Sequence, residues 1–173
     1  GLHLTLTSEW RGYRWGPVAG KAAVPGLVDP DGCMWSNVIS VATHASAEEV
    51  DKEIRAQLDR ALTLGIPITH LDTHMGTLYA KPEYTEAYVK LGIEKQIPIM
   101  IMGGHLQFIG EDEKDIVKQL QVTQLAEKVW QGGLPVLDDL LNRTYGWKTF
   151  DEKKANLLKA LGEMRPGLTM VIF

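Results

Sequence analysis

The sequence predicts an α/β fold in which strands and helices alternate along the chain, as they do in a parallel sheet or a (β/α) barrel. Short apolar runs are each followed by a longer segment with apolar residues at helical spacing, and this succession recurs about four times. The 173 residues, of which 45% are hydrophobic and 23% charged, match one ordinary domain with a sizeable core. We therefore expect a single α/β domain.

The first predicted strand spans residues 1–7, where apolar and polar side chains alternate with a period of two. The segment 8–44 follows, and it is rich in glycine, proline and aromatic residues without a sustained period. A loop of this length inside a compact domain is usually functional or disordered. The aromatic density at Trp10–Trp15 favours an ordered, functional loop.

Two helices are predicted next, with a strand between them. Ser46 and Glu49 have the spacing of a capping box, and apolar residues then recur at helical spacing until Gly65. The second helix spans 82–96 and has a proline in its first turn. The apolar run between them predicts a buried strand at 66–71.

The rest of the chain continues the alternation. The predicted strands lie at 97–102, 134–137 and 168–173, and the predicted helices lie at 112–130 and 150–164. Asp138 and Asp139 follow one of these strands, where they would either cap a helix or serve as active-site carboxylates, and we favour the cap.

Both ends of the chain fall inside predicted strands. It begins at Gly1 without a methionine, and it ends on an apolar run at Phe173. We therefore expect a fragment of a larger domain that is incomplete at both ends. A cytoplasmic location is expected, and any signal peptide would precede Gly1.

Charge and hydropathy exclude several functions. The net charge is −4 and lysine and arginine are scattered, so no basic stripe is available for nucleic acid. No uninterrupted apolar run approaches the ~20 residues of a membrane span. Cys33 is the single cysteine and has no internal disulfide partner.

The richest polar cluster is Thr69–His74, directly after the apolar run. On an extended strand His70, Asp72 and His74 share one face. Neighbouring side chains on that face are ~6–7 Å apart, so only one or two of the three are expected to bind one metal ion. We predict that His70 is a core histidine bonded to the backbone.

His3 occupies the polar face of the first strand, opposite Leu2 and Leu4. From the pattern alone it either makes a single hydrogen bond or supplies one metal ligand while the cluster supplies another.

The order of several motifs resembles the YdjC-type carbohydrate deacetylases, the family that includes chitooligosaccharide deacetylase. The resemblance rests on Gly1–Thr7, Pro25–Asp29, Asp31–Gly32 and Thr69–His74, with an amphipathic helix before the last motif. It implies that residues 1–173 form part of a distorted, TIM-like (β/α) barrel.

The same resemblance implies a divalent metal ion, Zn or Mg, held by His3 and His74. A third ligand and a catalytic carboxylate would come from an Asp-Asp motif upstream of Gly1, and a further histidine would lie beyond Phe173. Histidine ligands favour a borderline metal over Mg²⁺. Asp72 would orient an imidazole, act as an acid or base, or cap the following turn.

The implied enzyme is a carbohydrate deacetylase that removes N-acetyl groups from amino-sugar oligosaccharides, with a metal-activated water attacking the acetamide carbonyl. Trp10 and Trp15 would stack on sugar rings, and Arg14 would bind hydroxyl groups. The expected partner is an N-acetylated oligosaccharide, and a homodimer is left open.

Two other interpretations stay open from the sequence. A metal-dependent amidase or esterase acting on a non-sugar substrate would keep His3 and His74 but make the aromatic loop incidental. A non-catalytic carbohydrate-binding relative would keep the loop without the chemistry.

Overall fold

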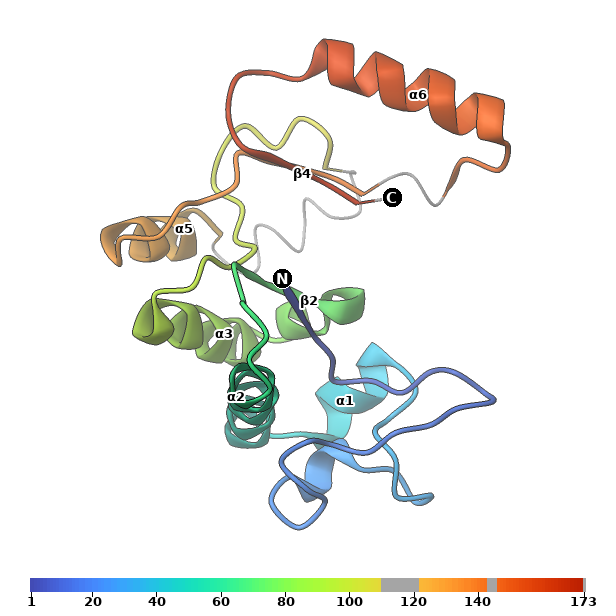
Figure 1. Ribbon diagram of the computed structural model, residues 1–173, viewed down its shortest axis with the longest axis vertical. Helices are drawn as coiled ribbons and strands as arrows, with labels where there is room; N and C mark the ends of the chain where they lie inside the picture. The colour runs from blue at the N-terminus through green and yellow to red at the C-terminus, as the bar shows by residue number, and fades with distance from the viewer. Residues whose placement is uncertain (110–121, 143–145, 173) are drawn as a thin grey trace. The chain divides into compact units, whose positions relative to one another are not determined.

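The structure is a computed structural model that describes residues 1–109, 122–142 and 146–172 (Figure 1). Helices and parallel strands alternate, which confirms the α/β fold. The chain divides into two compact units, Gly1–Met100 with Gly132–Leu134 and Ile101–Gln131 with Pro135–Phe173. None of the described helices is long and apolar enough to cross a membrane. The barrel and the extent of a single domain stay predictions.

In the first unit, β1 (Leu2–Leu4) pairs in parallel with β2 (Leu71–Thr73) (Figure 1). The register places His3 opposite Asp72. On its other side β2 reaches Ile99 through a single parallel bridge from Leu71. The first predicted strand is therefore confirmed in place, although only three of its residues are in the ladder.

The predicted strand at 66–71 is wrong in position, because the strand begins only at Leu71. The N–H of Ile66 still donates to the carbonyl of Ala61 in the last turn of the preceding helix. Pro67 follows and has no N–H to give to a ladder. The apolar run therefore serves as the return from the helix and not as the strand.

The helices α2 (Ala47–Thr63) and α3 (Pro82–Lys95) confirm the two predicted helices of this unit. They pack against one another, as Figure 1 shows. The capping box forms as expected: the Ser46 hydroxyl accepts from the Glu49 N–H, and the Glu49 carboxylate accepts from the Ser46 N–H. The core of the unit is a set of fully buried side chains: Leu4, Leu6, Leu27, Ile54, Leu58, Leu71, Leu78, Tyr84, Tyr88 and Leu91.

The long predicted loop contains two short helices that the sequence pattern did not reveal. They are the 3-10 helix η1 (Pro25–Leu27) and α1 (Val38–His44). Asn37 caps α1 by accepting a hydrogen bond from the N–H of Ser40. Two turns of helix are too short to show a period, and the β-branched residues of α1 favour strands, so only the cap could have predicted it.

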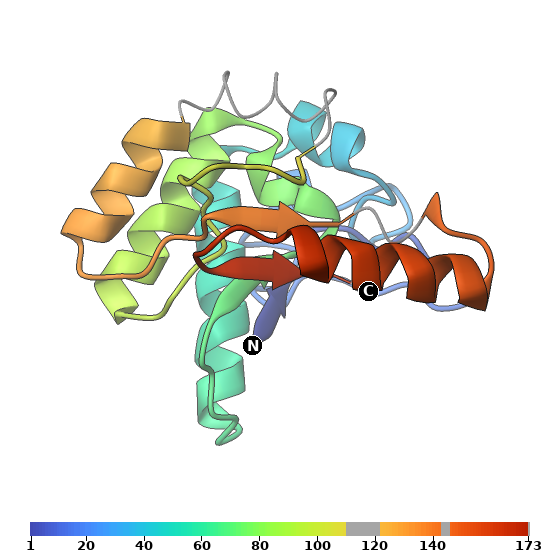
Figure 2. The ribbon, with the colours of Figure 1, turned by 90° about the horizontal axis from the view of Figure 1, so that it is seen from above.

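The second unit contains β3 (Asp139–Leu141), β4 (Thr169–Val171), α5 (Val122–Gln131) and α6 (Phe150–Glu163). Figure 2 shows β3 and β4 side by side and pointing the same way. Their parallel register sets Asp139 opposite Thr169. These elements confirm the predicted terminal strand and the helix at 150–164.

Three other predictions for this part of the chain need comment. The predicted strand at 134–137 is wrong, because the strand lies at β3 and only Leu137 forms an isolated bridge, to Met102. Residues 97–102 likewise contribute isolated bridges and no named strand. The first part of the predicted helix at 112–130 lies outside the described residues.

The capping box makes a prediction about stability and pH. Partial burial by itself would raise the pKa of Glu49, but hydrogen bonds from the N–H groups of Ser46 and Gly26 outweigh it and lower the pKa below its ordinary value of 4.5. The stabilisation by this carboxylate is therefore complete above the pKa of the unfolded chain and is lost as the pH falls through the lower folded-state pKa.

We expect Glu49→Gln to lower the free energy of unfolding by about 1 kcal/mol at pH 7. The difference from wild type should shrink as the pH falls below about 4.5, because both chains are then neutral at this position. Urea unfolding at several pH values measures it, with exposed Glu48→Gln as the matched control. A difference that does not change with pH would contradict the assignment.

Candidate active site

Four polar side chains meet where the chain leaves β1 and β2. His3 Nδ1 lies 2.9 Å from Asp72 Oδ2, and His74 Nε2 lies 2.7 Å from Glu9 Oε1. The remaining ring nitrogens, His3 Nε2 and His74 Nδ1, face one another at 3.1 Å. Two histidines are therefore paired edge to face, and each has a carboxylate on its outer nitrogen.

The carboxylates decide where the protons of neutral imidazoles lie. An ionised carboxylate only accepts hydrogen bonds, so His3 carries its proton on Nδ1 and His74 carries its proton on Nε2. His3 Nε2 and His74 Nδ1 are then both unprotonated, although they face one another. Two lone pairs at this distance repel unless a proton or a cation lies between them.

A divalent cation fits this donor pair. Two imidazoles that bind one ion at about 2.0–2.1 Å in tetrahedral geometry hold their nitrogens about 3.3 Å apart, close to the 3.1 Å found here. Histidine ligands commonly donate the other ring N–H to a carboxylate, as both rings do here. The described residues supply two ligands to such an ion. In residues 1–109, 122–142 and 146–172, no group of three or more His, Cys, Asp or Glu side chains could hold a metal ion.

The position of His74 depends on a tight turn after β2. His74 opens the 3-10 segment η2 (His74–Tyr79), and the next two residues, Met75 and Gly76, have left-handed backbone with φ of 52° and 63°. Two side chains hold the turn: the Thr73 hydroxyl accepts from the Leu78 N–H, and the Thr77 hydroxyl donates to the His74 carbonyl. The turn directs the imidazole back toward His3.

The hydroxyls of Tyr88 and Tyr79 bond the backbone of β2 and of the neighbouring Met100. The Tyr88 hydroxyl donates to the Leu71 carbonyl at 2.6 Å and accepts from the Met100 N–H at 2.9 Å. The Tyr79 hydroxyl donates to the Met100 carbonyl. Burial raises the pKa of both phenols, and the charge of Asp72 raises the pKa of Tyr79 further. These hydroxyls therefore stay protonated and act as fixed donors.

Glu9 is the site residue that the sequence reasoning missed. Partial burial by itself would raise its pKa, but hydrogen bonds from His74 and Thr7 outweigh this effect and lower the pKa below its ordinary value. The available signal was its position two residues after the end of an alternating strand that carries His3. The spacing alone could not show that Glu9 meets a histidine 65 residues away.

The aromatic loop presents two exposed rings next to Glu9. Trp10 is 63% exposed and Tyr13 is 69% exposed, and both contact the half-buried Trp15. Ser8 holds the base of the loop: its N–H donates to the Trp35 carbonyl, and its hydroxyl accepts from the Trp15 N–H. The tip of the loop is therefore an apolar surface on a fixed base.

Arg14 and Trp15 are held by internal contacts of the loop. The Arg14 guanidinium pairs with Asp29 at 2.6 Å and also donates to the Met34 carbonyl and the Ser8 hydroxyl. These contacts use Arg14 to pin the loop. Its predicted role in binding hydroxyl groups, like that of Trp15 in stacking, stays a prediction.

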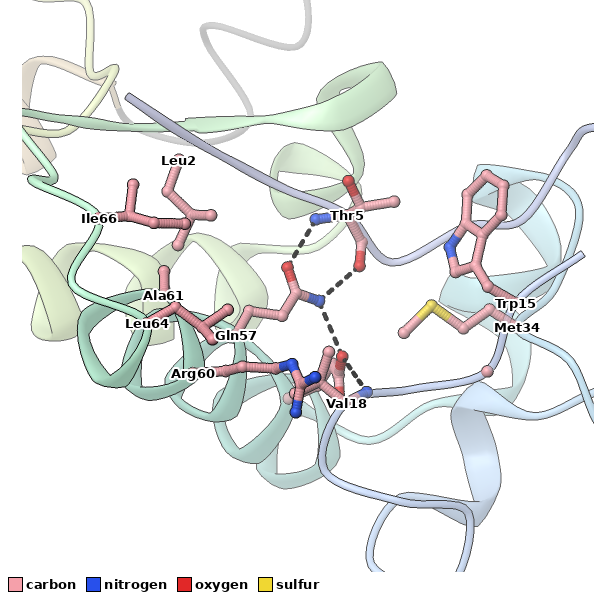
Figure 3. A pocket seen from close by; sticks show the side chains of 12 residues that line it. Leu2, Thr5, Trp15, Val18, Met34, Gln57, Arg60, Ala61, Leu64 and Ile66 are labelled. Atoms are coloured by element: carbon pink, nitrogen blue, oxygen red, sulfur yellow. Dashed lines mark hydrogen bonds between the residues drawn. The ribbon is translucent and has the colours of Figure 1, made fainter.

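A largely apolar pocket of about 280 Å³ lies beside β1 (Figure 3). Leu2 lines it, so it lies on the face of the strand opposite His3. Its apolar wall includes Trp15 and Met34 from the loop region, together with residues at the end of α2 and in the segment that follows: Ala61, Leu64 and Ile66.

A hydrogen-bonded chain forms the polar part of this pocket (Figure 3). Gln57 donates to the Thr5 carbonyl and accepts from the Thr5 N–H, and it also donates to Glu53. The fully buried Glu53 carboxylate accepts from the N–H groups of Val18 and Ala19. α2 is thereby joined both to the end of β1 and to the long loop.

Comparison with known proteins decides the family. A family model described as YdjC-like protein matches residues 1–173. The chain belongs to the YdjC-like family.

Several proteins named carbohydrate deacetylase are similar to this YdjC-like chain. The one from Thermus thermophilus is 37% identical over 91 residues, which are 53% of this chain and 33% of that protein. The one from Thermoanaerobacter pseudethanolicus is 24% identical over 173 residues, 99% of this chain and 57% of that protein. A third, from Brevibacillus brevis, is 32% identical over 99 residues. The chain thus spans between a third and just over half of the length of these relatives.

A solved structure from Enterococcus faecalis V583 has the same fold, with a TM-score of 0.72 and 23% identity over 99% of this chain and 57% of that one. That protein is described as a candidate for cellobiose-phosphate cleavage. At this identity the likeness concerns the fold alone.

Two sequence predictions about other polar residues of the YdjC-like chain are wrong. His70 is exposed and contacts the Thr69 hydroxyl at 3.0 Å, so it is not a core histidine. Asp138 and Asp139 cap none of the described helices: Asp138 accepts from the Leu168 N–H, and the buried Asp139 accepts from the N–H groups of Gln107 and Phe108. Both carboxylates instead hold loops of the second unit beside β3 and β4.

The support of β2 can be tested with Tyr88→Phe, which removes the hydroxyl that bonds the Leu71 carbonyl and the Met100 N–H, while these two groups still bond each other at 3.2 Å. We expect a loss of about 1 kcal/mol in the free energy of unfolding, measured by urea denaturation. The matched control is Tyr13→Phe at an exposed position, with a change within about 0.5 kcal/mol. Equal stability of Tyr88→Phe and wild type would show that the phenol is not a supporting group.

Proposed function

We propose that this chain is part of a metal-dependent carbohydrate deacetylase that removes N-acetyl groups from amino-sugar oligosaccharides. The observation that carries the proposal is the pair of facing ring nitrogens on His3 and His74, 3.1 Å apart, each on a ring whose other nitrogen contacts a carboxylate. The names of the relatives from Thermus, Thermoanaerobacter and Brevibacillus support the choice of substrate and reaction.

In this proposal His3 Nε2 and His74 Nδ1 hold a divalent ion, with Zn²⁺ favoured over Mg²⁺ by the imidazole ligands. When bound, such an ion supplies a Lewis acid that lowers the pKa of water and polarises an amide carbonyl. Asp72 holds the His3 ring by accepting its Nδ1–H. The His3 side chain is 54% exposed, so the centre is open to a substrate as large as a sugar.

The aromatic loop is the proposed sugar-binding surface. Trp10 follows Glu9 directly, and Glu9 contacts a proposed ligand, so the exposed indole lies in the same segment as the metal centre. A flat apolar ring with free edges suits the C–H face of a pyranose. Trp15 contacts Trp10 edge to face, with the ring centroids 5.8 Å apart. In this proposal Arg14 holds the loop in place through its ion pair with Asp29.

Acetate release from N-acetylglucosamine oligomers tests the reaction. The full-length protein loaded with Zn²⁺ should release acetate, and His74→Ala should lower kcat/KM by at least about 100-fold because it removes one of the two imidazole ligands. Glu48→Ala, at an exposed position on α2, serves as the matched control and should retain the activity. Hydrolysis of simple amides without release from the oligomers would instead support an amidase with a non-sugar substrate.

Trp10→Ala tests the sugar-binding surface. We expect KM for the oligomers to rise about three- to tenfold with little change in kcat, because stacking on an exposed ring contributes about 0.5–1.5 kcal/mol. Trp130→Ala removes a comparably exposed indole, 70% exposed, outside the loop and should leave KM unchanged. If both variants bind the oligomers as wild type does, the loop is not the sugar-binding surface.

A further inference from the structure

Glu9 joins the aromatic loop to the second histidine. Its Oε1 accepts from His74 Nε2 at 2.7 Å, and its Oε2 accepts from the Thr7 hydroxyl at 3.1 Å. Both oxygens therefore have a donor. The residues just before it are fully buried, since Thr7 and Ser8 are each 0% exposed. The carboxylate thus extends from a fixed piece of backbone and is itself held by Thr7.

His74 needs this contact more than His3 needs its own. His3 lies within a paired strand, and its ring lies beside its cross-strand neighbour Asp72. His74 instead opens a turn in which the next two residues have left-handed backbone. The Thr77 hydroxyl donates to its carbonyl. Among the described residues, the side chains within hydrogen-bond distance of its ring are His3, at 3.1 Å, and Glu9, at 2.7 Å.

Without Glu9 a competing state becomes available. If His74 carried its proton on Nδ1, that N–H would donate directly to His3 Nε2, 3.1 Å away. This hydrogen bond would occupy both nitrogens that face the proposed metal position, because His74 Nδ1 would carry the proton and His3 Nε2 would give its lone pair to that proton. The two histidines would then bind each other, and neither nitrogen would be free for a cation.

We infer that Glu9 is a positioning residue that holds His74 in the Nε2–H tautomer and thereby keeps the two facing nitrogens free for a metal ion. The part that concerns metal affinity rests on the proposed function, whereas the part that concerns the tautomer does not. Glu9 acts through His74 and is not assigned to the reacting atoms.

The first test needs no variant. Long-range ¹H–¹⁵N NMR of the metal-free, full-length protein at about pH 8 distinguishes the tautomers, because protonated and unprotonated ring nitrogens have separate ¹⁵N shifts. The expected result is a protonated Nε2 and an unprotonated Nδ1 on His74. A predominant Nδ1–H tautomer would overturn the inference whatever the variants do.

The second test compares two substitutions of similar size. Glu9→Met removes the acceptor, and we expect His74 to shift toward the Nδ1–H tautomer and Zn²⁺ affinity to fall about 10- to 100-fold, measured by calorimetry. Glu9→Gln keeps an oxygen that accepts from Nε2–H and should restore the tautomer and most of the affinity. Glu48→Gln, which removes an exposed carboxylate from α2, should change neither. Wild-type tautomer and wild-type affinity in folded Glu9→Met would refute the role.

These outcomes separate the inference from the proposed function. A protein whose Zn²⁺ affinity and tautomer depend on Glu9 but which releases no acetate would refute the deacetylase and leave the inference standing. A protein that releases acetate while Glu9→Met keeps its tautomer and affinity would refute the inference alone. If wild type binds no Zn²⁺, the metal part of both fails, and the tautomer measurement still decides the role of Glu9.

Discussion

The parallel register of β1 on β2 is the constraint on which the candidate site depends. It sets His3 opposite Asp72 and Leu4 opposite Thr73, and the turn that carries His74 begins at the next residue. A slip of one residue would send the His3 ring to the face occupied by Leu2 and Leu4. The ladder has three residue pairs, and groups around it hold each strand: Gln57 bonds the backbone of Thr5 just after β1, and the Tyr88 hydroxyl bonds Leu71 of β2.

A second constraint fixes the loop that leaves β1. Gln57 and the buried Glu53, both on α2, bind the backbone of Thr5 on one side and of Val18 and Ala19 on the other. A buried carboxylate is stable here because its acceptors are matched by backbone donors. The same helix thus holds both ends of the segment that contains Glu9 and the aromatic residues. The result is an exposed loop tip on a fixed base, which is the usual arrangement for a binding loop.

The two histidines of the candidate site have the same kind of hydrogen-bond partner. Each histidine has a carboxylate on its outer nitrogen, and the inner nitrogens face each other. The Asp72 contact is local to the strand pair, and its supporting role was among the alternatives that the sequence offered. In the structure Asp72 contacts His3 and not His74, which lies two residues further along the chain. On a continued strand Asp72 and His74 would share a face, but β2 ends at Thr73 and His74 opens the turn, so the cross-strand residue His3 is the partner of Asp72.

The sequence alone determined the α/β class and the helices at Ala47–Thr63, Pro82–Lys95 and Phe150–Glu163, and it predicted the two histidines that meet at the candidate site. Helical spacing, caps and prolines are local signals, and the histidine motifs carry a family resemblance that spans the chain. The tertiary structure decided where the short strands lie, that α1 exists, and that Glu9 reaches His74. A three-residue strand is chosen by its partners rather than by its own pattern, and a contact across 65 residues is created only when β1 and β2 pair.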